Sequence, residues 1–113
     1  VLKDNAYGHG VLEIASMAKE YGIKKAVVRV ESEAKIVEDF FDYILVLNSI
    51  PTTINVKIRY TINDIKSINS FAKGSLVELK VDTGMHRNGI VPSQLKDALQ
   101  SIKKCGLVLD GVF

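Results

Sequence analysis

Short apolar runs alternate along this chain with segments whose apolar residues recur at helical spacing, and this alternation constrains the fold most strongly. The predicted strands cover residues 1–2, 26–30, 43–47, 55–60, 76–81 and 107–113. The predicted helices cover residues 11–21, 31–41 and 92–105, and residues 61–64 lead into another that extends to residue 72. Strands that alternate with helices pair in parallel through right-handed crossovers. The chain is therefore predicted to be α/β, with either a doubly wound sheet or part of a (β/α)₈ barrel.

Two local signals refine this pattern. Ser32 stands where the helix at 31–41 begins, and serine is a favoured N-cap, so we expect it to cap that helix. Residues 55–60 alternate between apolar and polar side chains, which predicts a short strand with one face in solvent. No linker, low-complexity segment or sequence repeat divides the chain.

Composition excludes several classes of partner. Of 113 residues, 15 are basic and 13 acidic, so the net charge of +2 gives no reason to expect nucleic acid or an anionic membrane as a partner. No apolar run is long enough to span a bilayer. The single cysteine, Cys105, cannot form an internal disulfide, and we expect a reduced, cytoplasmic protein.

The two ends of the chain fall inside strand-like runs. Val1 and Leu2 lack the start of their strand, and residues 107–113 lack a closing turn. We expect residues 1–113 to be one partial barrel domain, about the first half of such a domain, with no second domain present. The chain is then a piece of a longer protein.

Two polar loops follow predicted strands, where parallel α/β folds bind their ligands. The sequence KDNAYGHG at residues 3–10 follows the first apolar pair, and KVDTGMHRNGI occupies residues 80–90. A lysine whose amine can lose its proton is a covalent catalyst for carbonyl compounds, and pyridoxal phosphate is the aldehyde to consider first for Lys3. Position alone leaves a surface lysine as the more common alternative. The glycine-rich dinucleotide turn and the P-loop are both absent.

These two loops resemble the two signature motifs of the alanine racemases, in the same order and on a compatible strand–helix pattern. The resemblance covers essentially the whole chain. It implies a (β/α)₈ barrel, pyridoxal phosphate as cofactor, a homodimer, and interconversion of L- and D-alanine that supplies D-alanine for peptidoglycan. It implies no metal.

The resemblance also implies roles for individual residues. Lys3 matches the lysine that forms the aldimine with the cofactor and then acts as the base on one face of the alanine Cα. Tyr7 matches a tyrosine near the cofactor phosphate, and Leu47 aligns with a residue packed near the cofactor ring. Lys80 matches a lysine that is carbamylated in several members, where the carbamate holds the residue matched by Arg87. Arg87 matches the arginine that orients the substrate carboxylate.

Some of the family's machinery is not in this sequence. The second base, on the opposite face of Cα, is in the family a tyrosine from the neighbouring subunit's C-terminal domain, so we expect this chain alone to be inactive. The signature also departs at three positions, where the family more often has a small residue, a glycine and a leucine. This chain has Asp4, His86 and Asn88 there.

Other interpretations remain open. Residues 82–84 form the Asp-Thr-Gly triplet of aspartic proteases, but such an enzyme needs an all-β fold. His9, His86 and Asp82 lack the local spacing of metal ligands. The chain could be a non-catalytic structural portion of a barrel. It could also belong to another pyridoxal phosphate barrel, such as an amino-acid decarboxylase-like protein.

Overall fold

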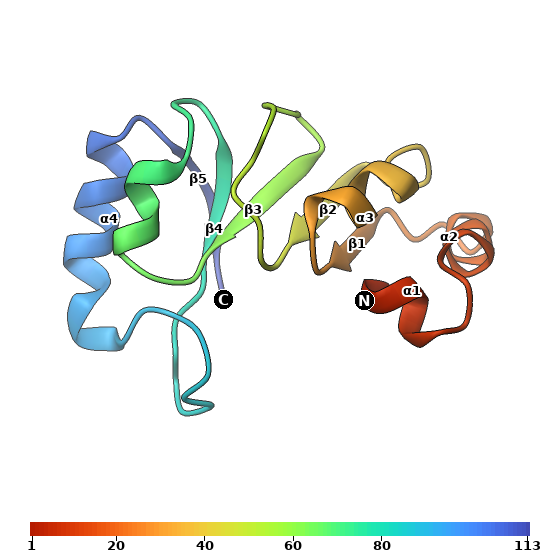
Figure 1. Ribbon diagram of the computed structural model, residues 1–113, viewed down its shortest axis with the longest axis horizontal. Coiled ribbons are helices and arrows are strands. Elements are labelled where there is room, and N and C mark those ends of the chain that lie inside the picture. The colour runs from red at the N-terminus through yellow and green to blue at the C-terminus, as the bar shows by residue number, and fades with distance from the viewer.

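The computed structural model describes residues 1–113, which form a parallel sheet of five strands (Figure 1). The strands are β1 (Lys25–Val28), β2 (Tyr43–Val46), β3 (Ile58–Ile62), β4 (Leu76–Leu79) and β5 (Val108–Val112). Their order in the sheet is their order in the chain, and all neighbours are parallel. A doubly wound sheet reverses its order at a switch point, whereas a barrel adds its strands consecutively. The sheet is therefore the α/β arrangement of an incomplete (β/α)₈ barrel.

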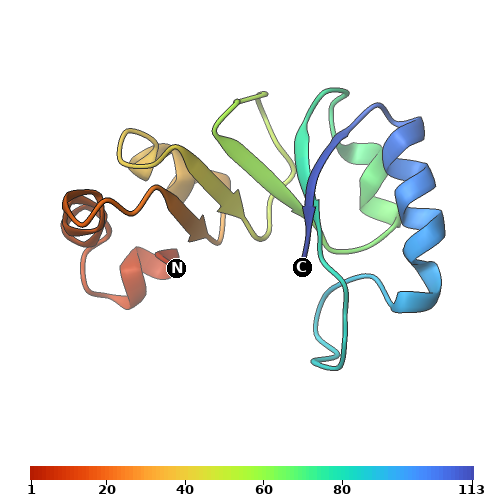
Figure 2. The ribbon, with the colours of Figure 1, turned by 180° about the vertical axis from the view of Figure 1, so that it is seen from behind.

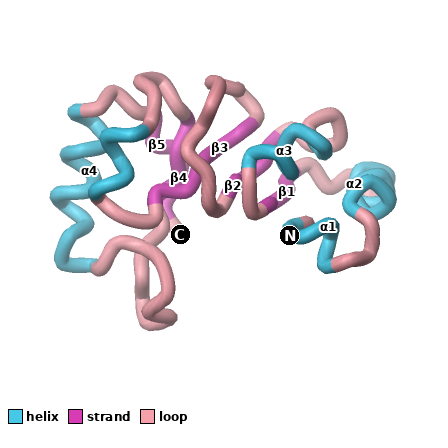
Figure 3. Tube along the Cα trace, viewed as in Figure 1, coloured by secondary structure: helices cyan, strands magenta, loops and turns pink.

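Helices accompany both ends of this sheet (Figure 3). They are α1 (Lys3–Tyr7), α2 (Val11–Glu20), α3 (Glu31–Val37) and α4 (Leu95–Lys104), with 3₁₀ turns η1 (Lys66–Ser70) and η2 (Pro92–Gln94). Helix α3 contacts β1 and β2, and α4 contacts β5. None of the helices combines the length and the apolar character needed to cross a membrane.

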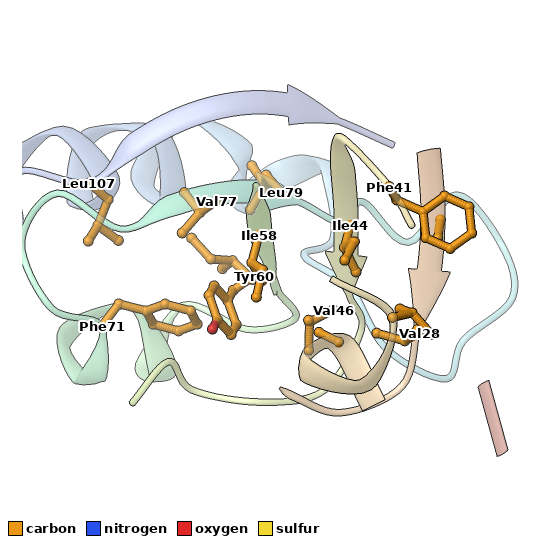
Figure 4. Close-up of a cluster of buried hydrophobic side chains, with 14 of the residues drawn as sticks. Val28, Phe41, Ile44, Val46, Ile58, Tyr60, Phe71, Val77, Leu79 and Leu107 are labelled. Atoms are coloured by element: carbon orange, nitrogen blue, oxygen red, sulfur yellow. The ribbon is translucent and has the colours of Figure 1, made fainter. Parts of the chain in front are cut away.

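The core lies on the face of the sheet that the helices cover (Figure 4). Alternate strand residues such as Val28, Val46 and Tyr60 are fully buried there, because successive side chains of a strand point to opposite faces. The other face carries polar groups. Arg59 Nε donates to Asp110 Oδ2 at 2.7 Å, and the guanidinium lies 4.6 Å from the Tyr43 ring centroid. This second face is the one that would line a closed barrel.

Four local predictions are wrong. Residues 1–2 do not form a strand, although Leu2 donates its N–H to Val27 O beside β1. Ser32 does not cap α3; the N-cap is Val30, and the Glu33 carboxylate accepts its N–H instead. Strand β3 extends to Ile62 and is mostly buried, because it lies between two other strands rather than at an edge. No α-helix follows it. Asp64 accepts hydrogen bonds from both the N–H and the hydroxyl of Ser67, which supports a tighter 3₁₀ turn.

Candidate active site

The chain after Lys3 makes a left-handed turn. Asp4, Asn5 and Ala6 have φ angles of 53°, 57° and 54°, and Tyr7 follows at 56°. Left-handed backbone costs about 1–2 kcal/mol for each residue that carries a Cβ, so neighbouring contacts must hold this segment. Element α1 is thus a single left-handed turn rather than an ordinary helix.

Contacts on both sides of the turn provide this support. Leu2 is buried and donates its N–H to Val27 O at 2.8 Å, which places the start of the chain beside β1. Ala6 is 3% exposed and donates to Leu2 O at 3.0 Å. The Asn5 side chain accepts the N–H of Val11 at 2.8 Å, which joins the turn to α2. Lys3 therefore directly follows a buried residue that is hydrogen-bonded to β1.

The second loop is organised by its own aspartate. Asp82 Oδ1 accepts the N–H groups of Gly84 and His86, both at 3.0 Å. These bonds lower the pKa of the Asp82 carboxyl below its usual value, and the bond from His86 has the larger effect, followed by the bond from Gly84. His86 Nδ1 lies 3.3 Å from Asp82 Oδ2. The backbone that leads to Arg87 is therefore wrapped around one carboxylate.

Gly89 fixes the return of this loop to the sheet. Its φ is +121°, and a Cβ at this position would lie 2.8 Å from Asp82 N and 3.1 Å from Val81 C. Both atoms belong to the backbone and cannot swing aside. The Gly89 N–H donates to Asn63 O at 3.1 Å, just beyond β3. Only glycine allows the loop to close this tightly.

The two loops meet at one edge of the sheet. In Figure 2 the loop after β4 projects from the same edge at which the chain begins. Between them is a pocket of about 190 Å³, smaller than the roughly 300–1,000 Å³ of typical ligand sites. It is lined by Lys3, Arg29, Leu47, Asn48, Asn63, Lys80, Arg87 and Asn88. The structure thus brings together four of the five residues singled out from the sequence: Lys3, Leu47, Lys80 and Arg87.

Tyr7 is the exception. Its side chain is 60% exposed and does not line the pocket. It still lies near the lysine, because Lys3 Nζ is 5.5 Å from the centre of the Tyr7 ring. The left-handed turn accounts for this placement, since it directs the chain away from the pocket after Lys3.

Four lining residues were not predicted as site residues: Arg29, Asn48, Asn63 and Asn88, of which Asn88 is named from the sequence only as a departure from the signature. Arg29 and Asn63 directly follow β1 and β3, and Asn48 lies two residues beyond β2. The signal was available, because a polar residue that ends an apolar parallel strand points to the ligand edge of the sheet. Asn63 also has a structural role, since its amide donates to Leu47 O at 2.8 Å.

The pocket is cationic. Four lining side chains are Lys or Arg, none is a carboxylate, and Leu47 is the one apolar member. Asp4 lies beside the lining and partly offsets the charge, at 3.3 Å from Arg29 Nη1 and 3.8 Å from Lys3 Nζ. A lysine amine among cations and amides fits a ligand with an aldehyde and anionic groups. Pyridoxal phosphate and an amino-acid carboxylate have these groups.

Comparison with known proteins identifies the family. The sequence profile described as alanine racemase, N-terminal domain, matches residues 1–113. The chain belongs to the alanine racemase family. It is 46% identical over 113 residues to an alanine racemase of a Nitratiruptor species, matching 100% of this chain and 33% of the relative. An alanine racemase of Campylobacter concisus is 44% identical over 114 residues, again with 100% of this chain and 34% of the relative.

Solved structures agree. A crystal structure of alanine racemase from E. faecalis superposes with a TM-score of 0.84 at 27% identity, covering 99% of this chain and 35% of that one. The resemblance to alanine racemases and the expected partial barrel are therefore confirmed. The chain spans about a third of the length of the racemases that it matches.

The local structure accounts for one departure from the family's signature. His86, where a glycine is more common, has a φ of 53°, in the left-handed region that glycine adopts without strain. Asp82 supports histidine at this position, because its Oδ1 accepts the His86 N–H and its Oδ2 lies 3.3 Å from His86 Nδ1.

Proposed function

We propose that the full-length protein containing this chain is an alanine racemase that depends on pyridoxal phosphate and supplies D-alanine for peptidoglycan in the cytoplasm. The observation that carries this proposal is the convergence of Lys3 and Arg87, from two loops far apart in the sequence, on one cationic pocket. Membership of the racemase family supports it.

Lys3 and Arg87 would divide the work. Pyridoxal phosphate, when bound, makes the Cα proton of an amino acid removable by delocalising the charge left behind. We assign Lys3 as the residue that attaches the cofactor and whose amine exchanges a proton with one face of Cα. We assign Arg87 to the substrate carboxylate, because its planar guanidinium binds two oxygens at once.

The other sequence-derived residues would support the cofactor. Leu47 is the apolar lining residue and would contact the flat face of the ring. Tyr7 lies close to Lys3 Nζ, and after a side-chain rotation its hydroxyl would donate a hydrogen bond to the phosphate. Lys80 would carry a carbamate, which turns a cation into an anion and pairs it with Arg87 in the same pocket. Carbamylation would be detected by ¹³C NMR after exposure to labelled bicarbonate.

The second acid/base group would come from outside residues 1–113. None of Tyr21, Tyr43 and Tyr60 lines the pocket: Tyr21 is 84% exposed, and Tyr60 is 1% exposed and donates to Glu31. Tyr43 lies beneath the Arg59 guanidinium. We therefore propose a homodimer whose partner subunit completes the site, and an inactive 113-residue chain.

The experiment that tests the proposal is chemical labelling of the full-length protein. Borohydride reduction in the presence of pyridoxal phosphate is expected to fix the cofactor on Lys3, as peptide mass spectrometry would detect. The same protein is expected to interconvert the alanine enantiomers. A label on another lysine, or release of CO₂ in place of racemisation, would contradict the assignment and favour a decarboxylase-like barrel.

A further inference from the structure

We propose that Glu33 is a positioning residue for Lys3, acting through the left-handed turn that follows it. The Glu33 carboxylate lies between the two elements that meet at the lysine. Its Oε1 accepts the N–H of Asp4 at 2.7 Å, and its Oε2 accepts the N–H of Arg29 at 2.7 Å. One side chain on α3 therefore joins the Lys3 turn to the end of β1.

This arrangement goes beyond capping a helix. A capping role needs only the N–H of Val30, and that bond is the longest of the three at 3.3 Å. The two shorter bonds go to residues outside the helix, and Asp4 lies 29 positions away along the chain. The two Glu33 oxygens therefore each accept a short bond at the pocket lining. One bond comes from the N–H of Asp4, the residue after Lys3, and the other comes from the N–H of Arg29.

The position of the bonds explains why Lys3 depends on them. Asp4 is the first left-handed residue, so its N–H lies at the point where the chain changes hand. On the other side, Leu2 is bonded to Val27 O. Lys3 is therefore held between two anchored peptide groups, one on β1 and one on Glu33. An ion pair of 3.3 Å between Asp4 and Arg29 adds a weaker link in parallel.

Glu33→Gln in the full-length protein isolates this role. The amide has the same shape but offers one acceptor oxygen, so one of the two short bonds is lost whichever way it turns. Because misplacement of a reacting group by about 1 Å can cost on the order of 100-fold in rate, we expect kcat for alanine to fall by roughly 10- to 100-fold. KM should change by less than about twofold, because Arg87 lies on the other loop, which Glu33 does not contact.

A readout independent of activity accompanies the kinetics. Hydrogen–deuterium exchange of the protein without added cofactor is expected to rise in the segment 2–8 and at the end of β1, with the rest of the chain unchanged. Ser32→Gly is the matched control, because Ser32 is exposed on the same turn of α3 and makes no side-chain hydrogen bond. It weakens the helix without touching Asp4 and should leave kcat and the exchange of segment 2–8 unchanged.

The outcomes separate this inference from the proposed function on which it rests. Unchanged exchange in segment 2–8, exchange that rises throughout the chain, or an unchanged kcat would each overturn it. If the full-length protein does not racemise alanine, the proposed function fails while the exchange experiment still decides whether Glu33 holds the turn. If the Glu33→Gln variant does not fold, the same measurements are made on Glu33→Asp, whose side chain is one methylene shorter but still charged. The same outcomes then apply.

Discussion

The two loops that form the pocket are held in place by different kinds of contact. The Lys3 loop, residues 3–10, depends on its neighbours: β1 binds Leu2, α3 binds Asp4, and α2 binds Asn5. The Arg87 loop, residues 80–90, depends mainly on itself, since Asp82 organises its turn and Gly89 packs against its own starting residues. The lysine is held by tertiary contacts and the arginine by local ones.

This difference matches the tasks that we propose for the two residues. A group that exchanges a proton with Cα must be placed accurately relative to the whole barrel, and bonds to three surrounding elements achieve this. A group that binds a carboxylate needs only a guanidinium held in a fixed orientation at the edge of the pocket. A loop stabilised by its own contacts can provide this. Changes in the first loop should therefore alter kcat, whereas changes in the second should alter KM or loop stability.

Lys3→Ala gives the largest expected effect. Removing a general acid/base group typically costs about 10²–10⁴-fold, and loss of the attachment point adds to this, so racemisation by the full-length protein should fall by at least about 10²-fold. Coupled-assay kinetics and the loss of the borohydride label measure the effect. Lys96→Ala, an exposed lysine on α4, is the matched control and should retain both. A Lys3→Ala protein with a tenth or more of the normal rate would contradict the assignment.

Gly89→Ala should be the most disruptive change in the second loop. The new Cβ would meet backbone atoms at 2.8 and 3.1 Å and would carry the strain of positive φ, together roughly 1–3 kcal/mol of lost stability. The Arg87 loop should shift and KM for alanine should rise. Gly8→Ala in the first loop is the control, because its φ is +87° but nothing lies within 4 Å of the new methyl group. Thermal denaturation of the two variants separates the effect of the backbone contact from the effect of positive-φ strain. Equal losses of stability in the two variants would contradict the packing argument.

Alternating periodicity was enough to predict most of the fold. Buried strands and helices were found because each pattern reports which side chains face the core. The prediction failed after β3, where apolar residues at helical spacing, such as Ile65 and Ile68, pack from a 3₁₀ turn instead. Periodicity cannot distinguish these cases over so short a segment. The local contact that accompanies the 3₁₀ turn is a hydrogen bond from the Ser67 N–H to the Asp64 side chain.

The site divides in a similar way. Motifs identified Lys3, Lys80 and Arg87, because each is part of a long signature. Arg29 and Asn63 are single polar residues outside any motif. They can be recognised as pocket residues only from their position directly after a parallel strand. The left-handed turn could not be predicted at all, since its non-glycine residues are held by long-range bonds such as that from Asp4 to Glu33.

Arg87→Lys should produce a smaller, selective defect. Lysine keeps the charge but loses the planar fork, so one of two hydrogen bonds to the substrate carboxylate is lost. A hydrogen bond to a charged group contributes about 1.5–3 kcal/mol, which corresponds to a rise in KM of roughly 10- to 100-fold with kcat less affected. The opposite split, with kcat reduced and KM unchanged, would place Arg87 with Lys3 and remove the contrast between the two loops.

Acid should loosen the second loop. Backbone N–H bonds from His86 and Gly84 lower the pKa of Asp82 from its usual 3.8, so the folded loop favours the ionised form. The sign follows from linkage: the stabilisation is fully present above 3.8 and is lost as the pH falls through the lower folded pKa. The protection of residues 82–88 against hydrogen exchange, measured relative to the intrinsic exchange rate at each pH, should fall over that range. Asp82→Asn keeps an acceptor oxygen but cannot titrate, so its exchange should be faster at neutral pH and flatter with pH. Equal acid sensitivity in the variant and the wild type would show that another group holds the loop.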